Sequence, residues 1–344
     1  MFEFDPYGSN VLFGLLILAM LAFSVEQAEA QRKAGRNGAV FLEISDGARE
    51  AALGGAVTSL ASGANQVFWN PAGTALDKDE TVSSSFSYAD WLVGLNYSSL
   101  AVGYNTGIGT VTLGVQALGV SDIEANRQNG YDSPVLQDLV TDPKTSSTYS
   151  YLDLAISGAY SRTFADKVSI GGTFKYIRES IDGVSASAFA FDFGSVYEVG
   201  VAGWKIAARV NNLGSELQFY NQSNPLPLNF SIGSSIYPVN NDRLRVLLSV
   251  DAVKPQDAQQ LLYGGTEVIF YDLLFLRGGY KFNYQGADDG GTSARPPIET
   301  TIEEFTLGAG IQSVISDVNV KFDYAYTSME LLDGTHRVTM KVGL

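Results

Sequence analysis

The stretch VNVKFDYAYT, residues 318–327, alternates apolar and polar side chains with a period of two. The apolar row consists of Val318, Val320, Phe322, Tyr324 and Tyr326. The opposing row consists of Asn319, Lys321, Asp323 and Thr327. Successive side chains of a β-strand point to opposite faces, so this period predicts a strand with one apolar and one polar face.

The same alternation recurs from residue 80 to the last residue, Leu344. Its segments predict an all-β chain of about fourteen strands. In the strand near 94–104 the alternation is lost at Ser98-Ser99, which predicts a β-bulge there. The expected strands lie near 80–88, 94–104, 109–118, 149–163, 167–180, 185–198, 202–213, 227–238, 243–253, 260–270, 273–284, 302–315, 317–328 and 335–344.

The connections between these strands separate two kinds of β protein. The long polar gaps, 119–148, 214–226 and 285–301, follow the third, seventh and eleventh strands, so they all lie on one side. Connections of the other parity are short, such as 316–317. Long loops at one end and tight turns at the other are typical of a transmembrane antiparallel β-barrel. A soluble β sandwich or propeller is the alternative.

In such a barrel the apolar row faces lipid and the polar row faces an enclosed lumen. Charged side chains should therefore lie inside, because each would cost several kcal/mol in hydrocarbon. We expect outer-membrane lipid around the barrel and a location in the bacterial outer membrane. The charged residues on the polar rows are Asp153, Lys175, Arg209, Arg245, Asp251, Glu267, Arg277, Lys281, Lys321, Asp323, Arg337 and Lys341.

Composition excludes several other functions. The formal net charge of −15 argues against nucleic acid as a partner, because phosphate binding needs a basic face. The chain has no cysteine and one histidine, His336, which falls on an apolar row, and it has no G-x-S-x-G motif. We therefore predict no enzyme activity and no cofactor. Asp288 and Asp289 in GADDGG could ligate a cation, but a surface loop is the favoured interpretation.

The first 30 residues are typical of an exported protein. Residues 11–25, VLFGLLILAMLAFSV, are uncharged and apolar, and Ala28-Glu29-Ala30 follows them. This arrangement predicts a signal peptide over 1–30, cleaved before Gln31, with a membrane anchor as the alternative. We expect a plug segment over 31–79 and the barrel over 80–344.

The segment ahead of the barrel contains SDGAREAALGGAVTSLAS, residues 45–62. We expect a helix over this range with Ser45 as its cap, and small residues on one face that permit close packing inside a lumen. In QVFWNPAGTAL, residues 66–76, we expect Phe68 and Trp69 to wedge against the wall. Asn70-Pro71 should then turn the chain outward into the first strand.

Residues 41–75 resemble the N-terminal signature of the PorV/PorQ family, which is related to FadL-type fatty-acid channels. The resemblance implies a fourteen-stranded outer-membrane barrel with a plug on its periplasmic side. It also implies a role in the type IX secretion system, in which the protein receives secreted cargo after translocation. The matching residues are Gly47, Ala48, Arg49, Ala52, Gly54, Gly55, Ala56, Trp69, Asn70, Pro71, Ala72 and Gly73.

The patterns and the family resemblance together lead to three hypotheses about function. The first is a secretion-system component whose long loops contact a cargo protein or other components of the system. The second is a FadL-like channel for long-chain fatty acids or another hydrophobic small molecule. SASAFAFDFG, residues 185–194, favours this channel because it is apolar on both faces, with Phe189 on one and Ala188 on the other. The third is a purely structural or adhesive barrel.

Overall fold

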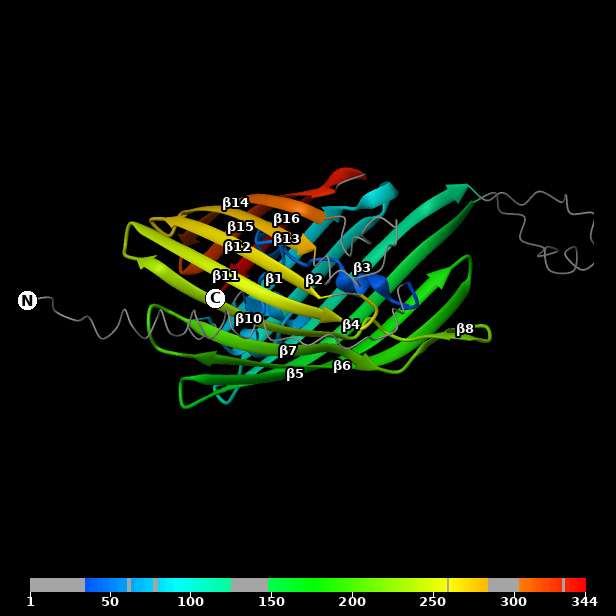
Figure 1. Ribbon diagram of the computed structural model, residues 1–344, viewed down its shortest axis with the longest axis horizontal. Helices are drawn as coiled ribbons and strands as arrows, with labels where there is room; N and C mark the ends of the chain where they lie inside the picture. The colour runs from blue at the N-terminus through cyan, green and yellow to red at the C-terminus, as the bar shows by residue number, and fades with distance from the viewer. Residues whose placement is uncertain are drawn as a thin grey trace, which may run out of the picture. The chain divides into compact units, whose positions relative to one another are not determined.

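The computed structural model describes residues 35–60, 63–76, 80–124, 148–258, 260–283, 303–329 and 332–344. The predicted signal peptide lies outside these residues. Among the residues described, no helix is both long enough and apolar enough to cross a bilayer. Fourteen strands form a closed barrel, and β8 (Leu217–Phe219) and β9 (Gln222–Asn224) form a separate two-stranded sheet (Figure 1). The barrel strands are β1 (Val82–Asp90), β2 (Asn96–Asn105), β3 (Thr110–Glu124), β4 (Thr148–Phe164), β5 (Val168–Ile181), β6 (Val184–Glu198), β7 (Lys205–Gly214), β10 (Asn229–Asn240), β11 (Leu244–Pro255), β12 (Leu261–Phe270), β13 (Leu274–Asn283), β14 (Glu303–Ile315), β15 (Val318–Met329) and β16 (Leu332–Gly343).

The barrel closes where its first and last strands meet. β1 pairs antiparallel with β16 from Ser83 opposite Gly343 to Asp90 opposite His336, and every other neighbouring pair of barrel strands is also antiparallel. Closure satisfies the backbone groups of both edge strands, which a bilayer requires because hydrocarbon offers no hydrogen-bond partner. The predicted fold class, a fourteen-stranded antiparallel β-barrel, is confirmed.

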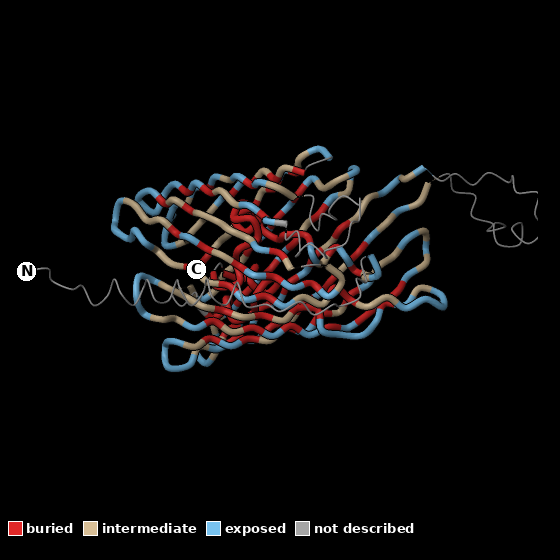
Figure 2. The backbone as a smooth tube through the Cα atoms, in the orientation of Figure 1, coloured by how far each residue is buried: buried red, intermediate tan, exposed pale blue. Residues whose placement is uncertain are grey.

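The alternation in residues 318–327 has the predicted orientation. Asp323, Ala325 and Thr327 are buried on the inner face of β15, whereas Phe322 and Tyr324 are exposed on its outer face. Figure 2 shows buried and exposed positions alternating along the strands. The outer faces form an apolar belt, and a closed barrel with such a belt belongs in the bacterial outer membrane.

The bulge expected in β2 is absent, so that prediction was wrong. β2 keeps an unbroken register with both β1 and β3 through Ser98 and Ser99. Tyr97 points inward and is fully buried, with Ser98 on the outer face. The sequence concealed the alternation because a large aromatic residue occupies a luminal position.

Among the described connections, the two ends of the barrel differ, and the predicted loop 214–226 is the one long loop that can be checked in full. At the tight-turn end, Ser316 and Asp317 form a two-residue turn with positive φ angles of 50° and 68°, as such hairpins favour. At the other end, the predicted loop 214–226 contains β8 and β9, which extend beyond β7 (Figure 1). Most of the other two predicted loops, residues 125–147 and 284–302, lies outside the described residues.

A charged residue in the middle of the apolar belt should destabilise the barrel. Ile156 lies midway along β4 and is 48% exposed on the outer face. We expect Ile156→Arg to lower the free energy of unfolding in phospholipid vesicles by about 2–4 kcal/mol, because a cation at the bilayer midplane is poorly solvated. Urea unfolding measures this change. The control is Ile108→Arg in a tight turn, where about 0–1 kcal/mol is expected. Equal effects of the two substitutions would contradict the membrane orientation.

Candidate functional site: the plugged lumen

The segment ahead of β1 folds into the lumen as four short helical turns. They are η1 (Val40–Glu43), α2 (Ala48–Ala52), η2 (Gly63–Phe68) and η3 (Pro71–Leu76). The helix predicted over 45–62 is therefore limited to five residues, and Gly47 rather than Ser45 occupies its N-cap. It ends because Gly54 and Gly55 adopt positive φ angles of 65° and 79°, which a right-handed helix does not contain. We call residues 39–75 the plug segment.

Glycines on the inner face of the wall allow the plug segment to approach the wall backbone closely. A Cβ on Gly265 would lie 2.6 Å from the Leu53 carbonyl oxygen, and one on Gly171 would lie 2.5 Å from the Pro71 carbonyl carbon. In the other direction, a Cβ on Gly54 would lie 2.8 Å from the Tyr280 amide nitrogen. Any side chain would force these backbones apart, so the glycines of wall and plug segment fit each other. The inward wall glycines in contact with the plug segment are Gly103, Gly114, Gly171, Gly194, Gly233, Gly265, Gly279 and Gly308.

Arg49 connects α2 to the wall through a buried ionic network. Its Nη2 lies 2.8 Å from Glu267 Oε1, and its Nε donates to Glu267 Oε2 over 3.0 Å. Arg277 Nε donates to the same Glu267 oxygen over 2.5 Å, and its Nη1 lies 2.7 Å from Asp323 Oδ1. Two guanidinium groups and two carboxylates therefore neutralise one another in a site that is almost closed to water. Such a network holds its members in one geometry, because an unpaired charge in that environment is costly.

Asp46 connects the start of α2 to β2. Its Oδ1 accepts hydrogen bonds from Tyr97 Oη over 3.2 Å and from Ser99 Oγ, and its backbone carbonyl accepts one from Trp69 Nε1 over 3.0 Å. Oδ2 has no hydrogen-bond partner among the described residues. Burial raises the pKa of Asp46 from 3.8 to about 6, although the hydrogen bond from Ser99 opposes this shift.

Phe68 and Trp69 contact the wall as the sequence suggested. A Cβ on Gly114 would lie 2.6 Å from the Phe68 ring, and the Arg209 guanidinium lies 5.1 Å from the centroid of the Trp69 ring. The Trp69 carbonyl accepts a hydrogen bond from Asn211 Nδ2 over 2.8 Å. Asn211 belongs to an irregularity in β7 opposite Asp192 of β6, so the wall departs from regular pairing where it holds this carbonyl.

Asn70 determines the backbone path after Trp69. Its Oδ1 accepts a hydrogen bond from the Ala72 amide over 3.1 Å, and its Nδ2 donates to the Thr58 carbonyl over 2.7 Å. The Gly73 amide donates to the Asn70 carbonyl over 2.8 Å. Asn-Pro therefore forms a turn, but the expectation that it sends the chain outward into the first strand was wrong. The chain continues inside the lumen as η3, because the Asn70 side chain satisfies the first amide of the new turn.

η3 lies along the inner faces of β4, β5 and β6. Thr74 Oγ1 donates to the Pro71 carbonyl over 2.9 Å and lies 2.6 Å from Ser161 Oγ of β4. Ala72 is fully buried with Val196 and Ala207 in a small apolar cluster. Positions 72 and 73 need small residues because other protein atoms lie directly against both of them.

The remaining motif residues lie at the start of the plug segment. The Ala48 amide donates to Thr339 Oγ1 of β16 over 2.8 Å. Gly47 faces the Glu50 carboxylate, and Gly55 faces the ring of Tyr263 on β12. The predicted motif therefore contacts the wall at many points. The sequence did not indicate Asp46, which is an ordinary acidic residue in a loop until Tyr97 and Ser99 are known to point inward.

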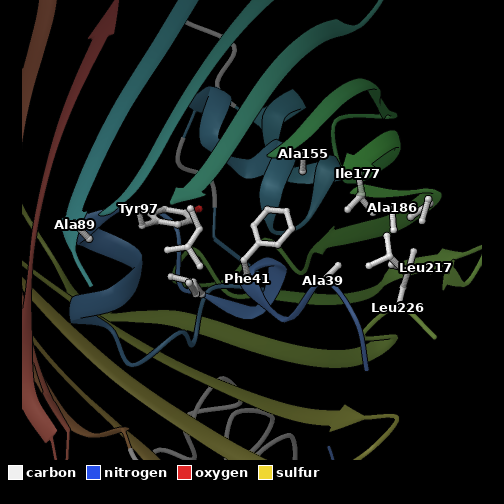
Figure 3. Packing of buried hydrophobic residues seen from close by; sticks show 13 residues of the cluster. Ala39, Phe41, Ala89, Tyr97, Ala155, Ile177, Ala186, Leu217 and Leu226 are labelled. Carbon is white, nitrogen blue, oxygen red and sulfur yellow. The ribbon is translucent and has the colours of Figure 1, made fainter. Parts of the chain in front are cut away.

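A second part of the lumen is apolar. Ala155 of β4, Ile177 of β5 and Ala188 of β6 are buried on the inner face, and Phe41 of η1 packs among them with Tyr97. In Figure 3 the Phe41 ring lies between Tyr97 and a group formed by Ile177, Leu217 and their neighbours. We call this cluster the apolar lining; its buried members are Ala39, Phe41, Ile44, Ala89, Tyr97, Leu118, Ala155, Ile177, Ala186, Ala188, Ala190, Leu217 and Leu226.

His336 and a possible cation site at Asp288 and Asp289 were also considered from the sequence. His336 is exposed on the outer face of β16, where its Nδ1 lies 2.7 Å from Tyr324 Oη, so it is far from the luminal groups described above. Asp288 and Asp289 lie outside the described residues. Within the described part of the chain, no group of three or more His, Asp or Glu side chains could hold a metal ion.

No family model matches the sequence, and no curated protein matches it. Solved structures of similar fold include the Ralstonia pickettii toluene transporter TbuX, with a TM-score of 0.56 and 14% identity over 86% of this chain and 96% of that one. The monoaromatic hydrocarbon channel CymD gives a TM-score of 0.55 and 12% identity over 86% and 96%. A mutant of the monoaromatic hydrocarbon channel TodX gives 0.56 and 12% over 86% and 97%. The chain therefore has the fold of these channels along nearly their full length.

Removal of the Arg49 charge should loosen the plug segment. We expect Arg49→Gln to lower the free energy of plug release by about 3 kcal/mol, because Glu267 is buried and then keeps only Arg277 as a partner. Amide hydrogen exchange of residues 48–60 measures this energy. The control is Lys205→Gln, which breaks a partly exposed 3.2 Å pair with Glu198 and should cost about 0–1 kcal/mol. Unchanged exchange in Arg49→Gln would refute the role of the network.

The raised pKa of Asp46 predicts a pH dependence. The folded protein binds a proton at Asp46 more tightly than the unfolded chain does. The contribution of Asp46 to the free energy of unfolding is therefore largest below about pH 4 and falls as the pH rises through about 6. We expect the urea midpoint to decrease between pH 5 and pH 7.5 and Asp46→Asn to reduce this decrease. An identical pH profile in Asp46→Asn would show that another group is responsible.

Proposed function

We propose that the protein is an outer-membrane channel for a hydrophobic small molecule. The observation that carries this proposal is the apolar lining. The lumen of a water-filled porin is polar, because its inward side chains contact water. Here consecutive inward positions of β6 are Ala186, Ala188 and Ala190, and Ile177 of β5 lies beside them. An apolar stripe on the inside of a barrel interacts more favourably with a hydrophobic solute than with water.

Phe41 indicates what kind of solute would suit this surface. Its ring is 3% exposed, so the plug segment itself already places an aromatic group against the stripe. A hydrophobic molecule of similar size would make the same contacts if η1 moved. The similarity of fold to a toluene transporter and to monoaromatic hydrocarbon channels supports the same class of solute.

Transport can be tested with labelled toluene and a labelled long-chain fatty acid in cells that do or do not produce the protein. We expect uptake of at least one of them to increase with the protein. Ala188→Phe should lower uptake about tenfold or more, because the added ring lies on the apolar lining next to Ile177 and competes with the solute for that surface. Ala188→Ser changes the residue by one hydroxyl and should leave uptake nearly unchanged. Equal uptake of both compounds with and without the protein would reject transport.

The resemblance to the PorV/PorQ family supports a second proposal, a role in type IX secretion. The structural feature in its favour is the length of β3, β4, β5 and β6, which have 15, 17, 14 and 15 residues compared with 9 and 10 in β1 and β2. Long strands at the long-loop end provide a surface for a cargo protein. Deletion of the gene should then abolish surface display of secreted proteins, and unchanged display would exclude this role.

A further inference from the structure

A charged cavity of about 210 Å³ lies between the plug segment and the tight-turn end of the lumen. The starts of β11, β13 and β15 and the ends of β12, β14 and β16 contribute to its wall. Four cations and two carboxylates line it, in a chain whose formal net charge is −15. Its charged residues are Arg49, Arg245, Lys321, Lys341, Glu80 and Glu267.

Three of the four cations already have carboxylate partners, and Arg245, described below, is one of them. Arg49 is bonded to Glu267 as described, and Lys341 Nζ lies 3.1 Å from Glu50 Oε1. Lys321 lies directly opposite Lys341 across β15 and β16, and both side chains line the cavity. Like charges at directly opposed positions destabilise a sheet unless another charge compensates them.

Lys321 has no carboxylate within ion-pair distance among the described residues. Its Nζ instead lies 3.6 Å from the centroid of the Phe275 ring. Two other luminal cations, Arg209 and Arg337, are 5% and 4% exposed and lie against aromatic rings. Lys321 differs from them because its ammonium group borders an accessible cavity.

Arg245 supplies a second group of donors to the same cavity. Its Nη2 is bonded to Asp272, whose side chain is exposed at a tight turn, and its buried Nε has no hydrogen-bond partner among the described residues. Arg245 is paired with Ile269, and Ile269 is paired with Phe275, so Phe275 lies on the strand between Arg245 and Lys321. A guanidinium and an ammonium around one cavity are the donors that proteins use for oxyanions.

We propose that this cavity binds a small oxyanion of the size and charge of inorganic phosphate, held by Lys321 and Arg245. The anion would balance the charge of Lys321, whose neighbour Lys341 already has Glu50 as a partner, and would accept hydrogen bonds that no described protein group accepts. This site is separate from the apolar lining, to which different residues contribute, and the proposal is independent of transport.

Isothermal titration of the purified full chain in neutral detergent with inorganic phosphate tests the proposal. We expect saturable binding at a single site in the unaltered protein. Lys321→Gln and Arg245→Gln should each weaken binding tenfold or more. Lys205→Gln removes one positive charge near a tight turn but not from the cavity, and it should leave binding unchanged. A heat-dependent change in gel mobility confirms that each variant has folded.

Three results would overturn the proposal. Absence of saturable phosphate binding to the unaltered protein would show that the cavity is not a phosphate site. Binding to Lys321→Gln with unchanged affinity would exclude Lys321 as a ligand. Equal weakening in Lys205→Gln and Lys321→Gln would mean that overall charge, and not this cavity, attracts the anion.

Discussion

The carboxylate of Glu267 is the point on which the arrangement of plug and wall depends. It is 1% exposed and accepts hydrogen bonds from Arg49 of the plug segment and from Arg277 of the neighbouring strand. A carboxylate in such a position is stable only when its charge is matched, so the wall needs the plug segment in order to bury this group. The inward glycines then allow the two backbones to meet without a layer of side chains between them. Charge determines where the plug segment attaches, and small residues determine how closely it fits.

This arrangement divides the lumen into regions of different chemistry. The ionic network and the closely packed glycines lie around α2, and the apolar lining surrounds Phe41 near the long-loop end. The charged cavity, which Arg49 and Glu267 of the network also line, opens at the tight-turn end. A water-filled pore would need polar groups throughout, whereas this lumen changes from apolar to basic along its length. The chain shares the fold of hydrocarbon channels, and the apolar lining is the part of its lumen on which the proposed transport of a hydrophobic solute rests.

The barrel could be predicted from the sequence because lipid imposes a simple rule on each strand. All fourteen strands lie close to their predicted positions, and residues such as Asp323 and Arg277 were assigned to the lumen from alternation alone. The rule failed at Tyr97, where an aromatic side chain is inward because Asp46 and Gln116 bond its hydroxyl. Local patterns could not define the plug segment equally well. Its helix is short because Gly54 must pass close to Tyr280, a contact between residues far apart in the chain. Partners such as Arg49 and Glu267 are likewise separated by 218 positions, a distance over which a single sequence contains no pairing information.

The seating of the plug segment in the lumen can be measured directly, because the chain has no cysteine of its own. A Cβ on Gly103 would lie 3.6 Å from the Cβ of Ala64, which is within the range of a disulfide. The double variant Ala64→Cys, Gly103→Cys should therefore form a disulfide under mild oxidation, visible as loss of reaction with a thiol reagent. Ala64→Cys combined with Val102→Cys, which faces lipid, should remain reduced. Two free thiols in the Ala64–Gly103 variant of the folded protein would contradict the plugged lumen.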